Sequence, residues 1–132
     1  MLRKHAVLIF SALFVLGLTV SVAVRADEWK YLGNSHVNGR VDHDNIHVGK
    51  SDGLFRAIQL RVSGGPIEFQ RVVVHYGNGS QEEIAVRESI PSGGKTRAID
   101  LPGDRRVIES VEIWYAKERM HSSPKVSLYG IR

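Results

Sequence analysis

Hydrophobic and polar side chains alternate along most of the chain beyond residue 27. The clearest example lies within residues 54–79, where Ile58, Leu60 and Val62 are each separated by one residue. A period of two is typical of a strand with one buried face, because successive side chains of a strand point to opposite sides. Two glycines and a proline in residues 63–66 then predict a turn.

A second alternating run follows this turn and changes its parity halfway. Phe69 has one parity and Val72 has the other. Alternation can change faces only where one residue is extra, so we predict a β-bulge near residues 70–71. The dipeptide Asn78-Gly79 ends the run and predicts a tight hairpin.

Further short strands are expected on both sides of this region. They are predicted at residues 29–32, 37–42, 46–48, 83–86, 97–101, 106–115 and 126–130, with a turn at Asp44-Asn45. In the 106–115 strand, one face should carry Val107, Val111, Ile113 and Tyr115, and the other Ser110, Glu112 and Trp114. No stretch has a sustained period of 3.6, so no helix longer than a turn or two is expected after the leader. Eight or nine short strands predict an all-β fold, an antiparallel β-sandwich, with a small β-barrel as the alternative.

The first 26 residues have the organisation of a signal peptide. Arg3 and Lys4 precede an uncharged apolar run, and small residues precede a cleavage position after Ala26. Cleavage after Ala23 and an uncleaved membrane anchor are the alternatives, since the run has the length of a short span. We therefore expect a bacterial protein that is periplasmic or secreted, with residues 27–132 as a single domain that does not insert stably into a membrane.

Removal of this leader changes the charge balance. The whole chain has 18 Lys and Arg against 14 Asp and Glu. Arg3, Lys4 and Arg25 belong to the leader and every acid follows it, so the mature chain is left with 15 against 14. A nearly neutral domain gives no reason to expect nucleic-acid binding. The chain has no cysteine, so its stability must come from packing without disulfides.

Residues 49–53 match the G-x-S-x-G pattern of hydrolase nucleophiles, with Ser51 at the serine position. That pattern works when the serine lies on a strained turn from a strand into a helix. Here a strand is predicted next, so we interpret the match as chance and assign no catalytic residue. Because the sequence shows no convincing set of nucleophile, base and metal ligands, the protein is expected not to be an enzyme and to need no cofactor.

The residues most capable of chemistry lie between His36 and Asp52. If this segment binds a metal ion, the ligands are expected to be His43, His47 and Asp44, because imidazole and carboxylate groups are common metal ligands. Alternation places Asp44 and His43 on opposite faces, which argues against their convergence on one ion. A small periplasmic hydrolase that uses this segment is the enzymatic alternative.

Four aromatic residues are candidates for ligand binding: Trp114, Phe55, Trp29 and Tyr31. Aromatic side chains on the surface of a sandwich can stack on sugar rings or hold a peptide. Trp114 shares its parity with Glu112, and Phe55 shares its parity with Gln59, so both are expected on polar faces. The structural alternative is that all four lie at the rim of the core.

Several segments resemble a family of small exported bacterial proteins, the YaaI-like domain of unknown function. The similarity lies in residues 46–49, 52–58, 77–79, 97–101 and 106–108, and it covers most of the chain from about Trp29 to Gly130. It implies export and a compact β fold. It implies no substrate, cofactor or catalytic residue.

We interpret the chain as an exported, non-catalytic binding or accessory module. Its ligand is expected to be an envelope protein or a glycan, and the domain is expected to be a monomer. A structural component of the envelope that assembles through an exposed strand edge is a further alternative.

Overall fold

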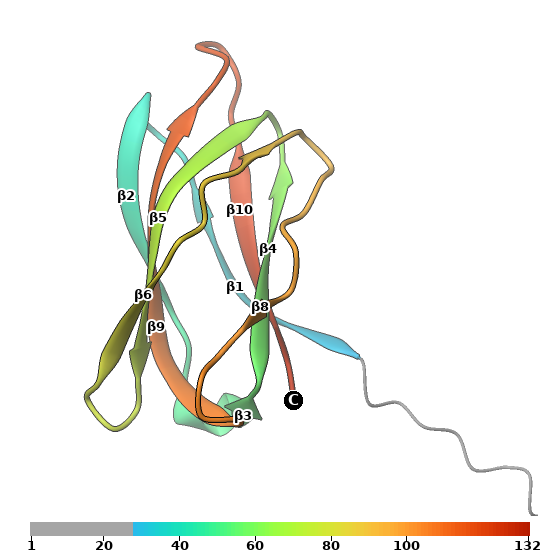
Figure 1. The fold of residues 1–132 in the computed structure, drawn as a ribbon. Coiled ribbons are helices and arrows are strands. Elements are labelled where there is room, and N and C mark those ends of the chain that lie inside the picture. Colours follow the sequence, from blue (N-terminus) through green and yellow to red (C-terminus); the bar gives the residue numbers. More distant parts are fainter. Residues whose placement is uncertain (1–27) are drawn as a thin grey trace, which may run out of the picture.

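The computed structural model describes residues 28–132, which form two packed antiparallel sheets (Figure 1). The elements in chain order are β1 (Trp29–His36), β2 (Val41–His47), the 3₁₀ turn η3 (Lys50–Asp52), β3 (Leu54–Phe55), β4 (Ala57–Ser63), β5 (Ile67–Tyr76), β6 (Gln81–Ile84), β7 (Ser89–Ile90), β8 (Ile99–Asp100), β9 (Arg106–Lys117) and β10 (Lys125–Ile131). Among the described residues, no helix is long and apolar enough to cross a membrane. The predicted signal peptide, residues 1–26, lies outside the described residues.

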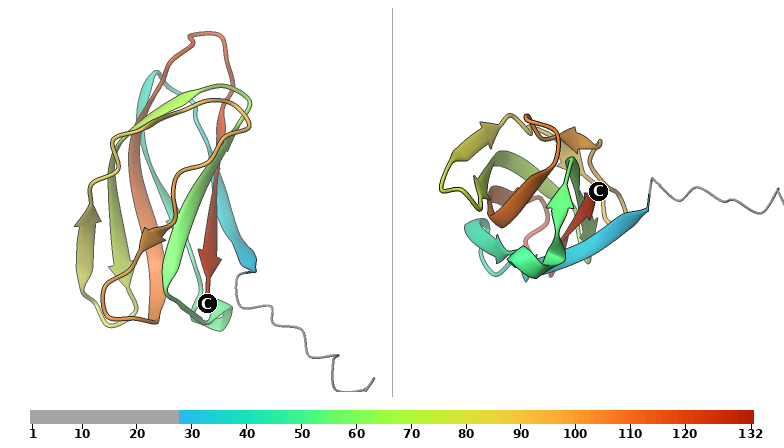
Figure 2. Two further views of the ribbon diagram at one scale, coloured as in Figure 1. Left: turned by 45° about the vertical axis from the view of Figure 1, so that its right-hand side comes forward. Right: turned by 90° about the horizontal axis from the view of Figure 1, so that it is seen from below.

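The strand order identifies the fold as a sandwich rather than a barrel. The first sheet, sheet A, has the order β1-β10-β4-β8, and the second, sheet B, has the order β2-β9-β5-β6. Two short strands extend sheet B, because β3 pairs with β9 and β7 pairs with β5. The views from the side and from below show the two sheets stacked face to face (Figure 2). The all-β prediction and its sandwich form are therefore confirmed.

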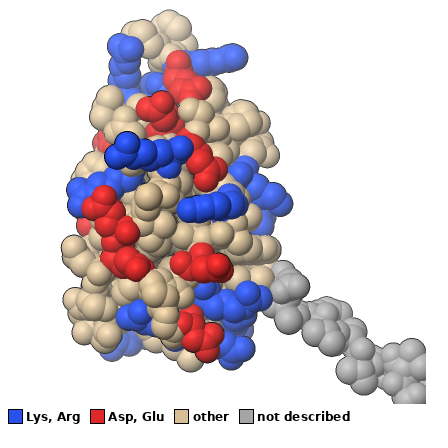
Figure 3. All heavy atoms as spheres, viewed as in Figure 1, with Lys and Arg blue, Asp and Glu red and all other residues tan. Residues whose placement is uncertain are grey.

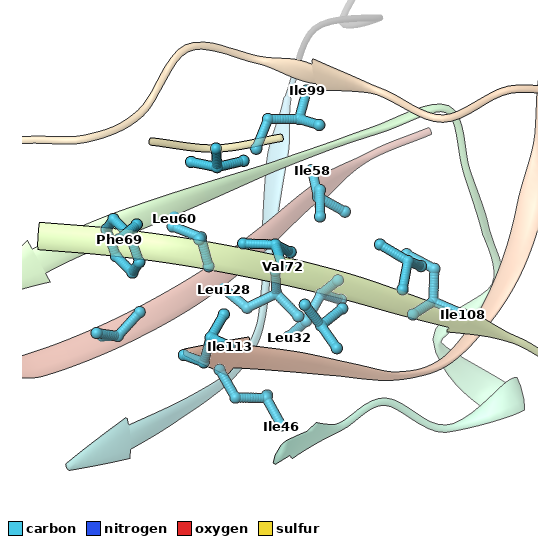
Figure 4. Packing of buried hydrophobic residues seen from close by; sticks show 14 of the residues in the cluster. Leu32, Ile46, Ile58, Leu60, Phe69, Val72, Ile99, Ile108, Ile113 and Leu128 are labelled. Carbon is cyan, nitrogen blue, oxygen red and sulfur yellow. The ribbon is translucent and has the colours of Figure 1, made fainter. Parts of the chain in front are cut away.

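The core lies between the two sheets and is built by alternation. Ile58, Leu60 and Leu128 come from sheet A, and Val72 and Ile113 come from sheet B (Figure 4). All five are fully buried. Each side chain of this size gives about 1.5–3 kcal/mol when it leaves water, so a core of this kind can hold a chain without disulfides.

The predicted β-bulge is present in β5. The register between β5 and β9 shifts between Phe69 and Arg71, which lets both Phe69 and Val72 point into the core. The predicted hairpin is also confirmed, because β5 pairs with β6 across the turn that contains Asn78 and Gly79.

The turn at residues 63–66 carries the chain from one sheet to the other. β4 belongs to sheet A and β5 to sheet B. The apolar sides of these two consecutive strands therefore face each other across the core. Gly64 has φ of +81°, and a Cβ atom built there would lie 2.4 Å from the backbone oxygen of Ser123. Glycine is therefore needed at this position both for the backbone angle and for space.

Two predictions near the N-terminal end, the end of the first strand and a turn in the second, are wrong. β1 does not end at Gly33 but continues to His36, with an irregularity of register between Tyr31 and Gly33. The predicted turn at Asp44-Asn45 is instead the middle of β2, where these residues pair with Ile113 and Glu112 of β9. Pairing with the long central strand overrides the local preference of Asp and Asn for turns.

The face assignment in β9 is correct only toward its C-terminal end. Val111, Ile113 and Tyr115 are buried as predicted. Nearer the start of the strand, Ile108 is buried in place of Val107. The register between β5 and β9 shifts between His75 and Tyr76, and this second irregularity reverses the parity.

Candidate functional site

The outer face of sheet A carries two tyrosines in contact. Tyr31 of β1 pairs with Tyr129 of β10, and both side chains point away from the core. Their ring centroids are 5.6 Å apart with an interplanar angle of 68°, an edge-to-face contact. Tyr31 is 48% exposed, although it is a large aromatic residue. It therefore offers ring surface to a ligand.

A guanidinium group covers the second tyrosine. The Cζ atom of Arg61 on β4 lies 3.7 Å from the ring centroid of Tyr129. Its Nε donates to Oε1 of Gln59 at 3.0 Å, and Nε2 of Gln59 donates to the backbone oxygen of Thr96 at 3.1 Å. Gln59 and Thr96 are buried, so this chain of hydrogen bonds fixes Arg61 in place. An oriented guanidinium can recognise a carboxylate or hydroxyl group with little loss of side-chain entropy.

Two more polar or aromatic groups extend this surface along β1. Trp29 lies two residues before Tyr31, so it points to the same face, where it is half-buried. The side-chain amide of Asn34 donates a hydrogen bond to the hydroxyl group of Tyr31. We call the set Trp29, Tyr31, Tyr129 and Arg61 the Tyr31 row.

Trp114 lies on the outer face of sheet B and is enclosed by its neighbours. It pairs with His43 of β2 on one side and with Arg71 of β5 on the other. The His43 ring is stacked at 4.3 Å with an interplanar angle of 10°, and Cζ of Arg71 lies 4.4 Å from the indole centroid. Because the two partners belong to strands on opposite sides of β9, both faces of the indole are occupied. Trp114 therefore offers an edge but no free ring face.

Glu112 links two histidines on the same outer face. Its Oε2 lies 2.6 Å from Nε2 of His43, and its Oε1 lies 2.5 Å from Nε2 of His75. Hydrogen bonds from His75 and then His43 lower the pKa of Glu112 below its usual value of 4.5. The cluster joins β2, β9 and β5 across the sheet.

The three predicted metal ligands are not brought together. His43 and His47 lie on the outer face of β2, whereas the carboxylate of Asp44 lies toward the interior and accepts hydrogen bonds from Ser35 and Tyr115. Within residues 28–132, no group of three or more His, Cys, Asp or Glu side chains could hold a metal ion. The metal hypothesis for His43, His47 and Asp44 is therefore not supported by the geometry.

The prediction that Phe55 lies on a polar face is wrong. Its side chain is fully buried, and Gly130 leaves space for its ring. β3 ends at Phe55, and the N–H of Arg56 bonds to the backbone oxygen of Ile131 at 2.9 Å before β4 begins. Alternation counted through Arg56 therefore assigns the wrong face to Phe55.

Tyr129 and Arg61 are not among the site residues predicted from the sequence. Alternation in the last strand could have identified Tyr129, because it shares the parity of Ser127 and not of the buried Leu128. Nothing in the sequence around Arg61 indicates that it belongs to this surface, since only the pairing of β4 with β10 places it beside Tyr129. Of the four predicted ligand-binding residues, the fold brings only Trp29 and Tyr31 onto one surface.

Comparisons with known proteins give the family and one structural relative. A structure of Pseudomonas aeruginosa AlgX is similar with a TM-score of 0.50 and 14% sequence identity, and the match covers 78% of this chain and 27% of that chain. This likeness concerns the fold, and the chain spans about a quarter of the length of that relative. No curated protein matches the chain. A model of the domain-of-unknown-function family DUF2541 matches residues 7–130, and the chain therefore belongs to that family.

Proposed function

We propose that this protein is an exported, non-catalytic binding module of the bacterial envelope and that the Tyr31 row holds its ligand. The observation that carries the proposal is an exposed aromatic ring beside a fixed guanidinium. Tyr31 is 48% exposed, and Arg61 is oriented by Gln59 and by the ring of Tyr129. The resemblance to small exported bacterial proteins and the signal-peptide pattern of residues 1–26 support export.

The surroundings of the other aromatic residues support the choice of this surface. The indole of Trp114 lies between His43 and Arg71, and Phe55 is buried in the core. Neither can stack on a ligand without a rearrangement. The Tyr31 row needs none, which favours binding because little ordering is required.

The geometry around residues 36–52 supports a non-catalytic role. An acid–base pair must lie within hydrogen-bond reach of the same reacting group. The carboxylate of Asp44 lies toward the interior and accepts hydrogen bonds from Ser35 and Tyr115. His43 lies on the outer face, where its ring is hydrogen-bonded to Glu112. These side chains therefore do not share a pocket.

The exposed edge of sheet B supports a monomer rather than an assembly through strand pairing. The backbone N–H of His43, on the edge strand β2, donates to the carboxylate of Asp42 at 2.8 Å. A side chain that occupies an edge N–H hinders the addition of another strand. Charges of both signs are interspersed on the face seen in Figure 3, without a large basic patch suited to nucleic acid.

We infer that the ligand is a glycan of the envelope. Tyr31 can pack against the apolar face of a sugar ring, while Arg61 and Asn34 can bond to its hydroxyl or carboxylate groups. The fold is similar to about a quarter of the longer AlgX chain, which fits a domain that can form part of a larger protein.

Calorimetric titration of the mature domain with peptidoglycan fragments and with neutral and acidic oligosaccharides tests the proposal. Binding should weaken roughly tenfold or more in Tyr31→Ala and in Arg61→Ala, the loss typical of a residue at the centre of an interface. Val41→Ala is the control, because Val41 is 67% exposed and lies on sheet B, outside the row. No binding to any of these glycans, or equal binding by Tyr31→Ala, would overturn the proposal.

A further inference from the structure

We propose that a second site, at the end of the sandwich, binds a small oxyanion, a carboxylate or phosphate group, through Lys50, Asn78, Arg105 and Arg106. These residues surround a pocket of about 420 Å³, which Tyr76 and Val107 also line. Ligand pockets usually measure roughly 300–1,000 Å³, so this one fits a single sugar acid or a phosphate monoester. None of its residues belongs to the Tyr31 row, so this site and the proposed function can fail independently.

Three connections that are far apart in the sequence build this pocket. Lys50 begins the η3 turn, Asn78 lies in the β5–β6 hairpin, and Arg105 precedes β9. Figure 1 shows these connections at the lower end of the sandwich, and Figure 2 shows the same end from below. Loops gathered at one end of a rigid sandwich are a common place for binding residues.

Arg106 is held in place from three directions. Its Cζ atom lies 3.8 Å from the ring centroid of Tyr76. Its two terminal nitrogens donate to the backbone oxygen of Pro102 at 3.0 Å and to the hydroxyl group of Ser80 at 3.3 Å. The guanidinium is therefore oriented before any ligand arrives, and its remaining N–H groups make no hydrogen bond with the residues that the structure describes.

The orientation of Asn78 is also determined by its neighbours. Its Oδ1 accepts a hydrogen bond from the backbone N–H of Ser80 at 3.0 Å and another from the Ser80 hydroxyl at 2.6 Å. A backbone N–H can only donate, so the bonded atom is the oxygen. The amide NH₂ group of Asn78 therefore remains as a donor.

Arg105 and Lys50 add two cations without partners. In the part of the chain that the structure describes, neither side chain makes a hydrogen bond or an ion pair, and no carboxylate lines the pocket. The nearby Glu82 carboxylate is already engaged by the hydroxyl group of Tyr76 at 3.0 Å. Next to Arg105, Asp104 has φ of +70°, a left-handed conformation that is uncommon for a residue other than glycine.

The chemistry of the lining selects the ligand. The polar side-chain groups that remain free are all donors, and three of the four carry a positive charge. A neutral sugar would leave these charges without counterions, whereas an oxyanion accepts several hydrogen bonds and balances the charge. Carboxylate and phosphate groups share this property.

Nuclear magnetic resonance titrations of the mature domain test the site. Inorganic phosphate and sodium glucuronate are added at constant ionic strength, with glucose as the neutral probe. We expect saturable shifts of the amide signals of Lys50, Asn78, Arg105 and Val107 with at least one of the two anions, and none with glucose. Response to phosphate alone assigns a phosphate-bearing ligand, and response to glucuronate alone assigns a carboxylated one.

Lys50→Ala and Arg105→Ala should each weaken anion binding roughly tenfold, since a hydrogen bond to a charged group has about that effect. Both residues are exposed, so the thermal unfolding of the variants should match that of the native domain. Arg119→Ala is the matched control, because it removes one exposed cation from the connection between β9 and β10. Absence of saturable shifts with both anions, equal shifts with glucose, unchanged affinity in the Lys50 and Arg105 variants, or an equal loss in Arg119→Ala would overturn the proposal.

Discussion

The hydroxyl group of Tyr115 donates a hydrogen bond to the carboxylate of Asp44, which also accepts one from the hydroxyl of Ser35. Tyr115 lies on the central strand β9, Asp44 on the edge strand β2, and Ser35 on β1 of the opposite sheet. One carboxylate therefore joins the two sheets along the open side of the sandwich, where the core would otherwise meet water.

Tyr115→Phe should lower the free energy of unfolding by about 1.5–3 kcal/mol, because hydrogen bonds to charged groups have this magnitude. The ring and its packing are preserved, so the loss can be attributed to the hydroxyl group. Urea unfolding at pH 7 measures it, and Tyr129→Phe is the control, since the Tyr129 hydroxyl makes no hydrogen bond within residues 28–132. A change no larger than that of the control would contradict the stabilising role of the Tyr115–Asp44 bond.

Stability should decline in alkaline solution because of buried tyrosines. Burial, followed by the hydrogen bond to Glu82, raises the pKa of Tyr76 to about 12, and burial also raises the pKa of Tyr115. A tyrosine in the unfolded chain ionises near pH 10. The free energy of unfolding should therefore be unaffected by these groups below about pH 10 and decrease from there toward pH 12. Urea unfolding between pH 8 and pH 11.5 measures the decline, which should be smaller in Tyr76→Phe; an identical decline would show that Tyr76 does not contribute.

Glu112→Gln should destabilise the domain only where the carboxylate is charged. The pKa of Glu112 is lowered by hydrogen bonds from His75 and His43, so its stabilising effect is present above about pH 4.5 and is lost as the pH falls further. His43 is about half exposed, so we expect a loss of less than about 1 kcal/mol at pH 6. Urea unfolding at pH 6 and at pH 3 should show a smaller difference at pH 3, because the stabilising effect decreases as the carboxylate becomes protonated. Glu109→Gln, an exposed carboxylate on the same strand, is the control and should leave both values unchanged.

Gly130→Ala should lower stability by overpacking the core. A Cβ atom at this position would lie 2.7 Å from Cδ1 of Phe55 and 2.9 Å from Cδ1 of Leu32. Both side chains are buried, so neither can move away freely, and a loss of about 1–3 kcal/mol is expected. Gly39→Ala is the control, because its nearest atom is 3.5 Å away. Equal thermal midpoints for the two variants would indicate that the Phe55 ring relaxes without cost.

The all-β class and the position of the bulge could be predicted from the sequence because both are properties of adjacent residues. The change of parity between Phe69 and Val72 requires an extra residue whatever the strand pairs with. The Asn78-Gly79 turn is likewise local, because few other residues adopt its backbone angles. The predictions for these positions are confirmed.

The candidate sites depend on which strands are neighbours, and that information is not local. Tyr31 and Tyr129 are separated by almost the whole domain and meet only because β1 pairs with β10. Lys50, Asn78 and Arg105 meet only because three connections end at the same side of the sandwich. A pattern within one segment could not have predicted that the residues of either set lie close together.

By itself, then, the sequence determined which residues alternate between core and solvent and where tight turns interrupt the strands, since neighbouring side chains in a strand point to opposite sides whatever lies around them. The tertiary structure alone decided that Asp44 continues a strand instead of turning, that Phe55 is buried, and that Trp114 is covered. Those outcomes follow from pairing with β9 and from packing between the two sheets, where contacts between residues distant in the chain outweigh local preference.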